Sequence, residues 1–215
     1  MKKHPRYAAA KAGDVYAAKD LISQTMSNEA LDRIRAIING KRPHLLAVHA
    51  LETAGLNVIP GVLADLLALS LDLPLLNNIV QINRVSHTGS SGYHRLAFPA
   101  LFDGAVDAEE YFLVDDFIGQ GGTLANIKGY LESRGAKIVG ASVLTGKSYS
   151  AKLTLTAETL QTLRRKHGNE LEQWWSAAFG FGFERLTESE ARYLIRSDDA
   201  DTISARIIAA RRERD

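Results

Sequence analysis

One stretch near the middle of the chain constrains the fold more than any other, the run YFLVDDFIGQGGT at residues 111–123. It opens with apolar residues, as a buried strand does, and continues with Asp115 and Asp116. Three glycines then permit a tight turn. Residues 124–133 follow with leucine and isoleucine at helical spacing. The run therefore predicts a strand, a glycine-rich turn and a helix in direct succession.

The rest of the chain alternates in the same way. We expect helices at residues 13–25, 28–39, 60–71 and 124–133, and strands at 45–48, 73–77, 79–82, 111–114 and 138–144. Strands that alternate with helices form a parallel sheet with right-handed crossovers. Residues 83–106 are expected to be a long loop, of the kind that serves as a lid or a binding segment.

The character of the chain changes at residue 150. Beyond it we expect only helices, at residues 156–167, 169–178, 187–197 and 201–214, the third opened by a capping box from Thr187 to Glu190. The predicted fold class is α/β, with a mainly parallel central sheet flanked by helices and a C-terminal helical appendage. The expected divisions are N-terminal helices at 1–40, a core at 41–149 and the appendage at 150–215.

Composition excludes some classes of function. The formal net charge of +1 favours neither nucleic acid nor an anionic membrane as partner. The longest apolar run, at residues 62–71, is too short for a membrane span of about 20 residues. The first ten residues lack the apolar region of a signal peptide. The absence of cysteine excludes disulfides and cysteine-based zinc sites and is compatible with a cytoplasmic protein.

The glycine-rich turn has the features of an anion site. In a parallel α/β sheet, ligands bind where strands end and helices begin. Backbone N–H groups in such a turn can point at one anion, and the helix N-terminus adds partial positive charge. The alternative is an ordinary capped turn with solvated carboxylates. Two rival phosphate motifs fail: Gly140 and Gly146 are separated by five residues instead of the four of a P-loop, and no Gly-x-Gly-x-x-Gly opens the first strand–helix turn.

The whole run resembles the 5-phosphoribosyl-1-diphosphate (PRPP) motif of the type I phosphoribosyltransferases. That motif is an apolar strand, two acidic residues, two apolar residues, a variable residue, Thr-Gly, a small residue and Thr. This chain departs from it at Gln120, where the family has threonine. The resemblance covers about residues 40–148. It implies that the 5-phosphoribosyl group of PRPP passes to a nucleobase nitrogen with release of pyrophosphate, and it implies Mg²⁺ and a homodimer.

The resemblance also implies roles for particular residues. Asp115 and Asp116 are the catalytic pair and accept hydrogen bonds from the ribose hydroxyls. No dedicated metal ligands are implied, because Mg²⁺ would be held by PRPP, with Asp115, Asp116 and water as further contacts. The residues expected to bind the 5′-phosphate are Gly119, Gln120, Gly121, Gly122, Thr123 and Leu124. Those expected to bind pyrophosphate are Ala50, Leu51, Glu52 and Thr53. The flexible loop would contribute Arg84, His94 and Arg95, beside His87, and Lys147 would recognise the base.

Several alternatives stay open at this stage. Gln120, the absence of an acidic residue at position 119 and a flexible loop without lysine favour a non-catalytic protein of the same fold that senses PRPP or a nucleotide. A third class is an interaction protein whose helical tail carries the function. The aromatic residues of the tail are expected to form a core between its helices: Trp174, Trp175, Phe179, Phe181 and Phe183.

Overall fold

The computed structural model describes residues 1, 3–48, 51–52, 55–83, 85, 91–197 and 199–212. It divides into two compact units. The first comprises Met1–Arg84, Ala100–Ile118 and Asn126–Gly146, and the second comprises Val85–Pro99, Gly119–Ala125 and Lys147–Asp215. The expected boundaries after residues 40 and 149 stay a prediction.

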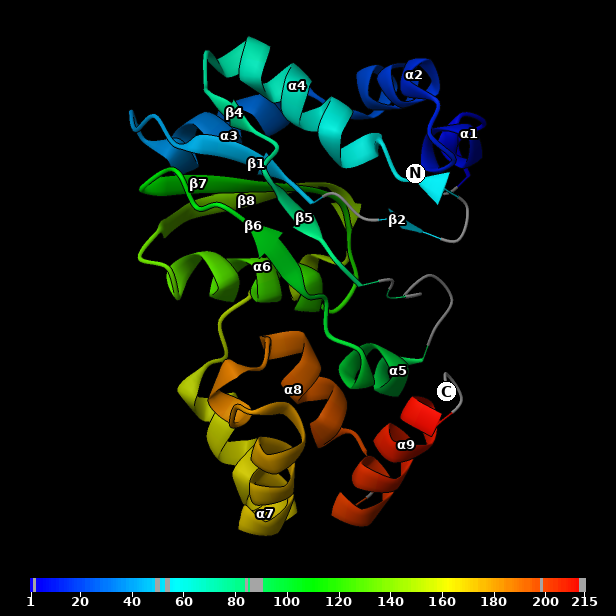
Figure 1. Ribbon diagram of the computed structural model, residues 1–215, viewed down its shortest axis with the longest axis vertical. Coiled ribbons are helices and arrows are strands. Elements are labelled where there is room, and N and C mark those ends of the chain that lie inside the picture. The colour runs from blue at the N-terminus through cyan, green and yellow to red at the C-terminus, as the bar shows by residue number, and fades with distance from the viewer. Residues whose placement is uncertain are drawn as a thin grey trace. The chain divides into compact units, whose positions relative to one another are not determined.

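The first unit is built on a four-stranded sheet (Figure 1). Its strands are β1 (His44–Ala47), β4 (Leu75–Leu76), β7 (Glu110–Ile118) and β8 (Lys137–Gly146), in the order β4-β1-β7-β8. All neighbouring pairs are parallel. This confirms the predicted mainly parallel sheet.

Strand β7 is longer than the apolar run alone predicts. The expected strand ended at residue 114, whereas β7 continues to Ile118 because β8 pairs with it all the way to Gly146. Backbone pairing with β8 therefore holds Asp115 and Asp116 inside the strand, and the expectation that both follow its end was wrong. Side chains on a hydrogen-bonded strand are held more firmly than side chains on a loop.

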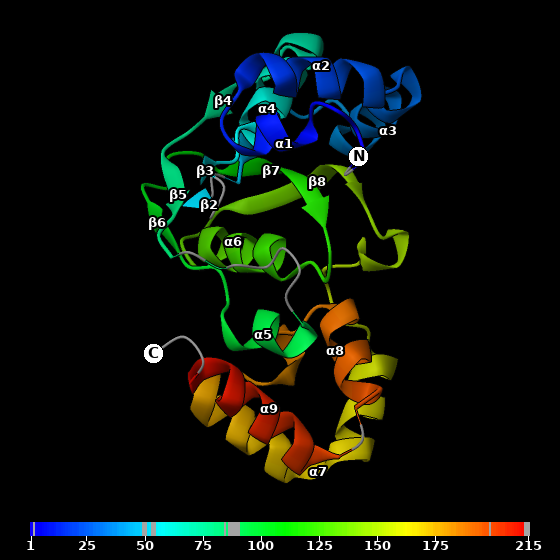
Figure 2. The same ribbon diagram turned by 90° about the vertical axis from the view of Figure 1, so that its right-hand side faces the viewer.

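Helices cover both sides of this sheet. The two views place α2 (Val15–Thr25), α3 (Asn28–Ile38) and α4 (Ile59–Leu71) on one side and the second half of α6 (Gly122–Glu132) on the other (Figures 1 and 2). Pro60 lies in the first turn of α4, where its missing N–H costs nothing. The core between these helices and the strands includes Leu21, Leu63 and Phe112.

A short helix precedes those expected. Helix α1 (Tyr7–Lys11) packs against α2, and Ala10 on it is fully buried. Asp14 is the last residue of the connection between α1 and α2, and it caps α2. Its carboxylate accepts a hydrogen bond from the N–H of Ala17 at 3.0 Å. The sequence gives little sign of α1, because five residues are too few for a periodic pattern.

Two small antiparallel pairs complete the first unit. Strand β2 (Leu51–Glu52) pairs with β3 (Gly55–Leu56), and β5 (Ile79–Gln81) pairs with β6 (Phe102–Gly104). Gly104 has a φ of +135°, and a Cβ there would overlap the carbonyl oxygen of Asn78, so the close pairing needs glycine. Strand β5 therefore lies in a separate sheet with β6 and not in the main sheet. The apolar pattern of residues 79–82 does not distinguish between these two places.

The expectation of an uninterrupted loop at residues 83–106 was wrong. Within that segment α5 (Gly92–Ala97) is a helix and β6 is a strand. The N-cap is Ser91, whose hydroxyl accepts from the N–H of His94. Helix α5 belongs to the second unit, where the hydroxyl of Tyr93 bonds to Ser197 Oγ at 2.6 Å. Such long-range partners are invisible to local sequence patterns.

The second unit is helical. Its remaining elements are η1 (Ser148–Ser150), α7 (Ala157–Phe179), η2 (Phe183–Arg185), α8 (Glu188–Ile195) and α9 (Ala200–Arg212). Trp175 and Phe183 are fully buried in a core of their own with Leu163, and Trp174, Phe179 and Phe181 pack against it. This confirms the C-terminal helical part and the structural use of the aromatic cluster.

The chain between residues 156 and 179 forms two helices, as expected. They meet at a kink at Gly168, whose backbone angles are not helical, with φ at 71° and ψ at 179°, and the label α7 covers both. The capping box at α8 is confirmed, with Thr187 and Glu190 each bonding the backbone of the other. Within the described residues, no helix is both long and apolar enough to cross a membrane.

Candidate functional site

The acidic pair is buried on β7. Asp115 is 8% exposed and Asp116 is 5% exposed, among the few buried charged side chains of the described chain. Oδ1 of Asp115 accepts a hydrogen bond from the backbone N–H of Asp116 at 2.8 Å. Buried carboxylates are rare without partners, so this pair needs either a cation or hydrogen-bond donors.

A cation is present at the pair, and the sequence did not reveal it. Nζ of Lys11, the last residue of α1, lies 3.0 Å from Oδ2 of Asp116. The Lys11 side chain is 12% exposed and that of Asp116 is 7% exposed, so the ion pair is largely shielded from water. Only the tertiary fold brings α1 to the end of β7, which is why no local motif could have predicted the contact.

The surroundings of Asp115 disfavour its ionised form. Burial raises the pKa of Asp115 well above its ordinary value, and the negative charge of Asp116 raises it further. A hydrogen bond from the backbone of Asp116 and the charge of Lys11 oppose the rise.

The glycine-rich turn occupies residues 119–121, between the end of β7 and the start of α6. Gly121 has a φ of +88°, a conformation that favours glycine. Within the second unit, the hydroxyl of Ser150 donates to the carbonyl oxygen of Gly119 at 2.6 Å, and the hydroxyl of Thr187 donates to that of Gln120 at 2.8 Å. Both hydroxyls are buried, so side chains of the tail fix the conformation of the turn.

A third side chain of the tail approaches the turn. A Cβ at Gly122 would stand 2.6 Å from Oε1 of Glu190, so a larger first residue of α6 would displace the Glu190 carboxylate. Burial raises the pKa of Glu190. Its other oxygen accepts from the N–H of Thr187 in the capping box, so the same carboxylate holds α8 and lies against α6.

The side-chain oxygen of Gln120 is an unused hydrogen-bond acceptor in the described part of the chain. This Oε1 atom is buried and has no hydrogen-bond partner among the described residues. The backbone carbonyl of Gln120, in contrast, is engaged by Thr187. A side-chain oxygen of this kind is able to accept a hydrogen bond from a ligand.

The remaining predicted residues are spread over other parts of the chain. Ala50, Thr53 and Arg84 lie outside the described residues, and Leu51 and Glu52 form β2. His94 and Arg95 lie on α5, where the His94 ring packs 4.8 Å from that of Phe98. Lys147 directly follows β8, is exposed and has its ammonium 5.7 Å from the ring centre of Tyr149. Their assigned roles stay predictions.

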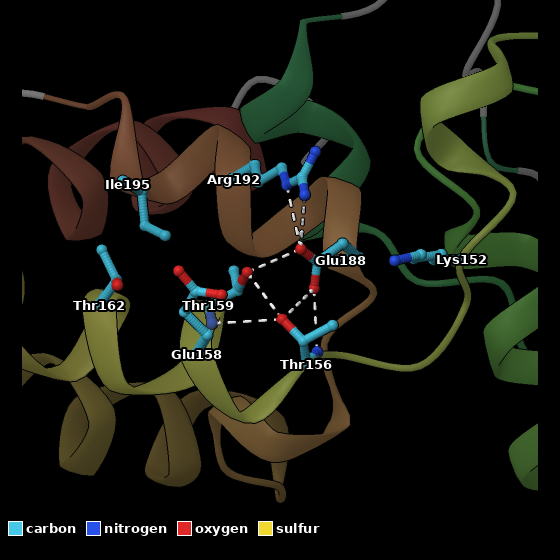
Figure 3. A pocket seen from close by; sticks show the side chains of 8 residues that line it. All are labelled: Lys152, Thr156, Glu158, Thr159, Thr162, Glu188, Arg192 and Ile195. Atoms are coloured by element: carbon cyan, nitrogen blue, oxygen red, sulfur yellow. Dashed lines mark hydrogen bonds and ion pairs between the residues drawn. The ribbon is translucent and has the colours of Figure 1, made fainter.

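The second unit also has a polar pocket of about 240 Å³. Figure 3 shows Glu188 at its centre, accepting hydrogen bonds from the N–H of Thr156 at 2.9 Å and from the hydroxyl of Thr159 at 2.6 Å. Arg192 forms an ion pair with the same carboxylate. These contacts tie the start of α7 to the start of α8, so we assign Glu188 a structural role.

The described residues contain no cluster of three or more His, Asp or Glu side chains that could hold a metal ion. Asp115 and Asp116 supply two carboxylate groups, which are ligands of the kind that Mg²⁺ accepts. Two such side chains fit a Mg²⁺ ion that keeps several waters and takes its other oxygens from a phosphorylated ligand. They do not make a cage built by the protein alone.

Comparison with known proteins gives relatives in sequence and in structure. No family model matches the chain. Protein TraN of Escherichia coli is 37% identical over 99% of the chain, and an uncharacterized protein of Haemophilus influenzae is 39% identical over 60% of it. The matched regions cover 48% and 29% of these proteins, so the chain spans less than half the length of the curated relatives it matches.

The structural similarities are to adenine phosphoribosyltransferases. One such enzyme has a TM-score of 0.40 at 15% identity and covers 64% of this chain and 74% of its own. That of Leishmania donovani has a TM-score of 0.37 at 14% identity, covering 70% of this chain and 71% of its own. At such low identity and TM-score the similarity is distant.

Proposed function

We propose that the chain binds PRPP and transfers its 5-phosphoribosyl group to a nucleobase nitrogen, releasing pyrophosphate. One observation carries the proposal. Two adjacent carboxylates, 8% and 5% exposed, are held by strand pairing immediately before a glycine-rich turn that opens a helix. Carboxylates that precede an anion-binding turn suit a sugar whose hydroxyls and phosphate are a few bonds apart.

The turn would bind the 5′-phosphate. Residues 119–124 offer backbone N–H groups, the Thr123 hydroxyl and the start of α6, whose partial positive charge favours an anion. Ser150 and Thr187 fix the turn from the other side through its carbonyl oxygens. A turn already held in shape loses little entropy when it binds a ligand.

The acidic pair would orient the ribose and support the reaction. The bond between C1 of the ribose and the pyrophosphate oxygen breaks, its electron pair leaves with pyrophosphate, and a new bond forms from the base nitrogen to C1. Positive charge develops on the sugar ring, and the Asp116 carboxylate stabilises it. The base nitrogen loses its proton to solvent or to the leaving group. Mg²⁺, when bound, would neutralise charge on the leaving pyrophosphate.

A second function is favoured by Gln120. Its side chain is longer than the threonine of the family motif, and its buried Oε1 is an acceptor without a partner among the described residues, which a phosphate oxygen cannot satisfy. A protein that binds PRPP or a nucleotide without turning it over, and regulates a partner, would tolerate such a residue. We keep this sensor as the alternative.

One experiment separates these functions. The protein is incubated with Mg²⁺, PRPP and a panel of purine and pyrimidine bases, while pyrophosphate release and the thermal shift are followed together. Base-dependent release supports the transferase, and stabilisation without release supports the sensor. If PRPP gives neither, both functions are refuted.

The Asp116→Asn variant tests the role of the carboxylate. Asparagine has nearly the same shape but no charge, so the strand pairing of β7 should persist. We expect turnover to fall by at least about a hundredfold, as when one electrostatic partner of a transition state is removed. Far-ultraviolet circular dichroism should be unchanged. Turnover equal to that of the wild type would remove Asp116 from the mechanism.

A further inference from the structure

Lys11 has no place in the sequence motif, yet its ammonium group lies at the proposed ribose site. It ends α1, whose neighbouring Ala10 is fully buried and fixes the helix against α2. Its Nζ lies 3.0 Å from Oδ2 of Asp116. The inference below rests on the proposed function, because it concerns how the same acidic pair recognises ribose.

Burial gives this contact weight. An exposed lysine–aspartate pair contributes little to stability, because water screens it and both side chains lose freedom. Here the two side chains are only 12% and 7% exposed. A buried ammonium group needs a partner, and so does a buried carboxylate, so each fixes the position of the other.

The contact still leaves Asp116 able to bind a ligand. Oδ2 of Asp116 is buried and accepts no hydrogen bond from any described residue, although Lys11 lies within ion-pairing distance. A carboxylate oxygen has two lone pairs, so Oδ2 can accept from a ligand hydroxyl as well as pair with Lys11. In Asp115, Oδ1 already accepts from the backbone N–H of Asp116.

We propose that Lys11 is a positioning residue of the acidic pair: its ammonium group holds the Asp116 carboxylate in place, so that Asp116 is the main acceptor for the ribose hydroxyls. The 3.0 Å contact between Nζ and Oδ2 fixes the orientation of this carboxylate. In Asp115 one carboxylate oxygen is already engaged by the backbone N–H of Asp116. Without Lys11 the Asp116 carboxylate would lose the contact that orients it toward a sugar with adjacent hydroxyls.

The test uses ribose 5-phosphate without Mg²⁺, so that metal binding cannot replace the lysine. Affinity is measured by isothermal titration at neutral pH, for the wild type and for Lys11→Met, Lys11→Arg and Lys19→Met. Lys19 lies on α2 and is exposed, which makes its variant a matched control for loss of one positive charge.

We expect Lys11→Met to weaken binding about tenfold or more, the usual effect of losing a partner to a charged group. Lys11→Arg should restore most of the affinity, and Lys19→Met should bind like the wild type. The affinity of the wild type should also fall for 2-deoxyribose 5-phosphate, and Lys11→Met should lose this preference.

Other outcomes overturn the proposal. If the wild type binds ribose 5-phosphate and Lys11→Met binds equally well, Lys11 is not a positioning residue, and the proposed function stands. If the wild type does not bind, the proposed function fails and the role of Lys11 fails with it. A purely structural lysine would weaken the binding of both sugars by the same factor and keep the preference, which also refutes the proposal.

A second comparison tests the roles of the two carboxylates even if Lys11→Met does not fold. An asparagine at position 115 keeps an oxygen that can accept from the backbone N–H of residue 116, whereas at position 116 it removes the charged partner of Lys11. Asp115→Asn should therefore keep ribose 5-phosphate affinity within about threefold, while Asp116→Asn should lose about tenfold or more. The reverse order, or equal losses, would contradict the proposal.

Discussion

At the scale of single residues, the acidic pair is predicted to bind the ligand, and its position lowers the stability of the fold. Two adjacent carboxylates on one strand repel each other, and burial deprives both of water. The chain places them there all the same and brings Lys11 from another helix to one of them. Unfavourable local electrostatics of this kind are typical of functional sites.

The pKa of Asp115 leads to a prediction about stability. Because its pKa in the folded protein is raised above the ordinary value of about 3.9, the native state binds the proton more tightly than the unfolded state. Stability is therefore lost as the pH rises from the ordinary toward the raised pKa.

Asp115→Asn should abolish this loss. Relative to the wild type, its free energy of unfolding should rise with pH over that window, by about 1.4 kcal/mol for each unit by which the pKa is raised. Urea denaturation at a series of pH values measures the difference. A difference that stays constant with pH would show that Asp115 titrates normally.

At the scale of elements, the sequence predicted most helices and strands but not all their contacts. The periodicity of α3, the capping box of α8 and the apolar run of β7 are local signals, and each element was found where its signal lies. Helix α1 and the pairing of β5 with β6 have weak local signals. They depend on distant partners such as α2 and the carbonyl group of Asn78.

The residues of the candidate site divide in the same way, into those with a local signal and those without one. Asp115, Asp116 and the glycines could be singled out because they are consecutive and form a motif. Lys11, Ser150 and Thr187 could not, because each contacts the motif only through the tertiary fold. A lysine, a serine and a threonine at unremarkable positions carry no signal until the fold brings them to their partners.

Two glycines near α6 allow a paired test of the turn. Gly121 has a φ of +88°, and a Cβ there would lie 2.9 Å from Cδ2 of Leu153, whereas a Cβ at Gly129 within the helix meets nothing within 4 Å. We expect Gly121→Ala to destabilise the protein by about 1–2 kcal/mol through backbone strain. Gly129→Ala should stabilise it by about 0.5–1 kcal/mol, since alanine favours a helix.

Chemical denaturation of both variants provides the measurement. Gly121→Ala should also weaken ribose 5-phosphate binding, because the turn is displaced, while Gly129→Ala should leave binding unchanged. Equal stability of the two variants would contradict the strained conformation assigned to Gly121.

At the scale of the whole molecule, the described residues form two hydrophobic cores. One lies between the parallel sheet and α2, α3 and α4, and the other lies among α5, α7, α8 and α9. The tail is more than an appendage, because its residues Ser150, Thr187 and Glu190 contact the turn at 119–122. The helical part therefore bears on the proposed phosphate site.

Removing the largest side chain of the second core should reveal this division. Trp175 is 1% exposed, and Trp175→Ala should cost about 3–5 kcal/mol through the cavity it leaves. Hydrogen exchange should then show the loss of protection concentrated in α7, α8 and α9, with β1, β7 and β8 less affected. Equal loss throughout the chain would show that the two cores unfold as one.

The most direct test of the central claim is a competition titration at the proposed site, with PRPP, ribose 5-phosphate and pyrophosphate as ligands in the presence of Mg²⁺. If the acidic pair and the turn recognise a phosphorylated ribose, PRPP and ribose 5-phosphate will compete for one site. Pyrophosphate alone will bind more weakly, and Asp116→Asn will reduce the affinity for both sugars. Pyrophosphate that binds as tightly as PRPP, or sugar phosphates that do not bind at all, would contradict this account.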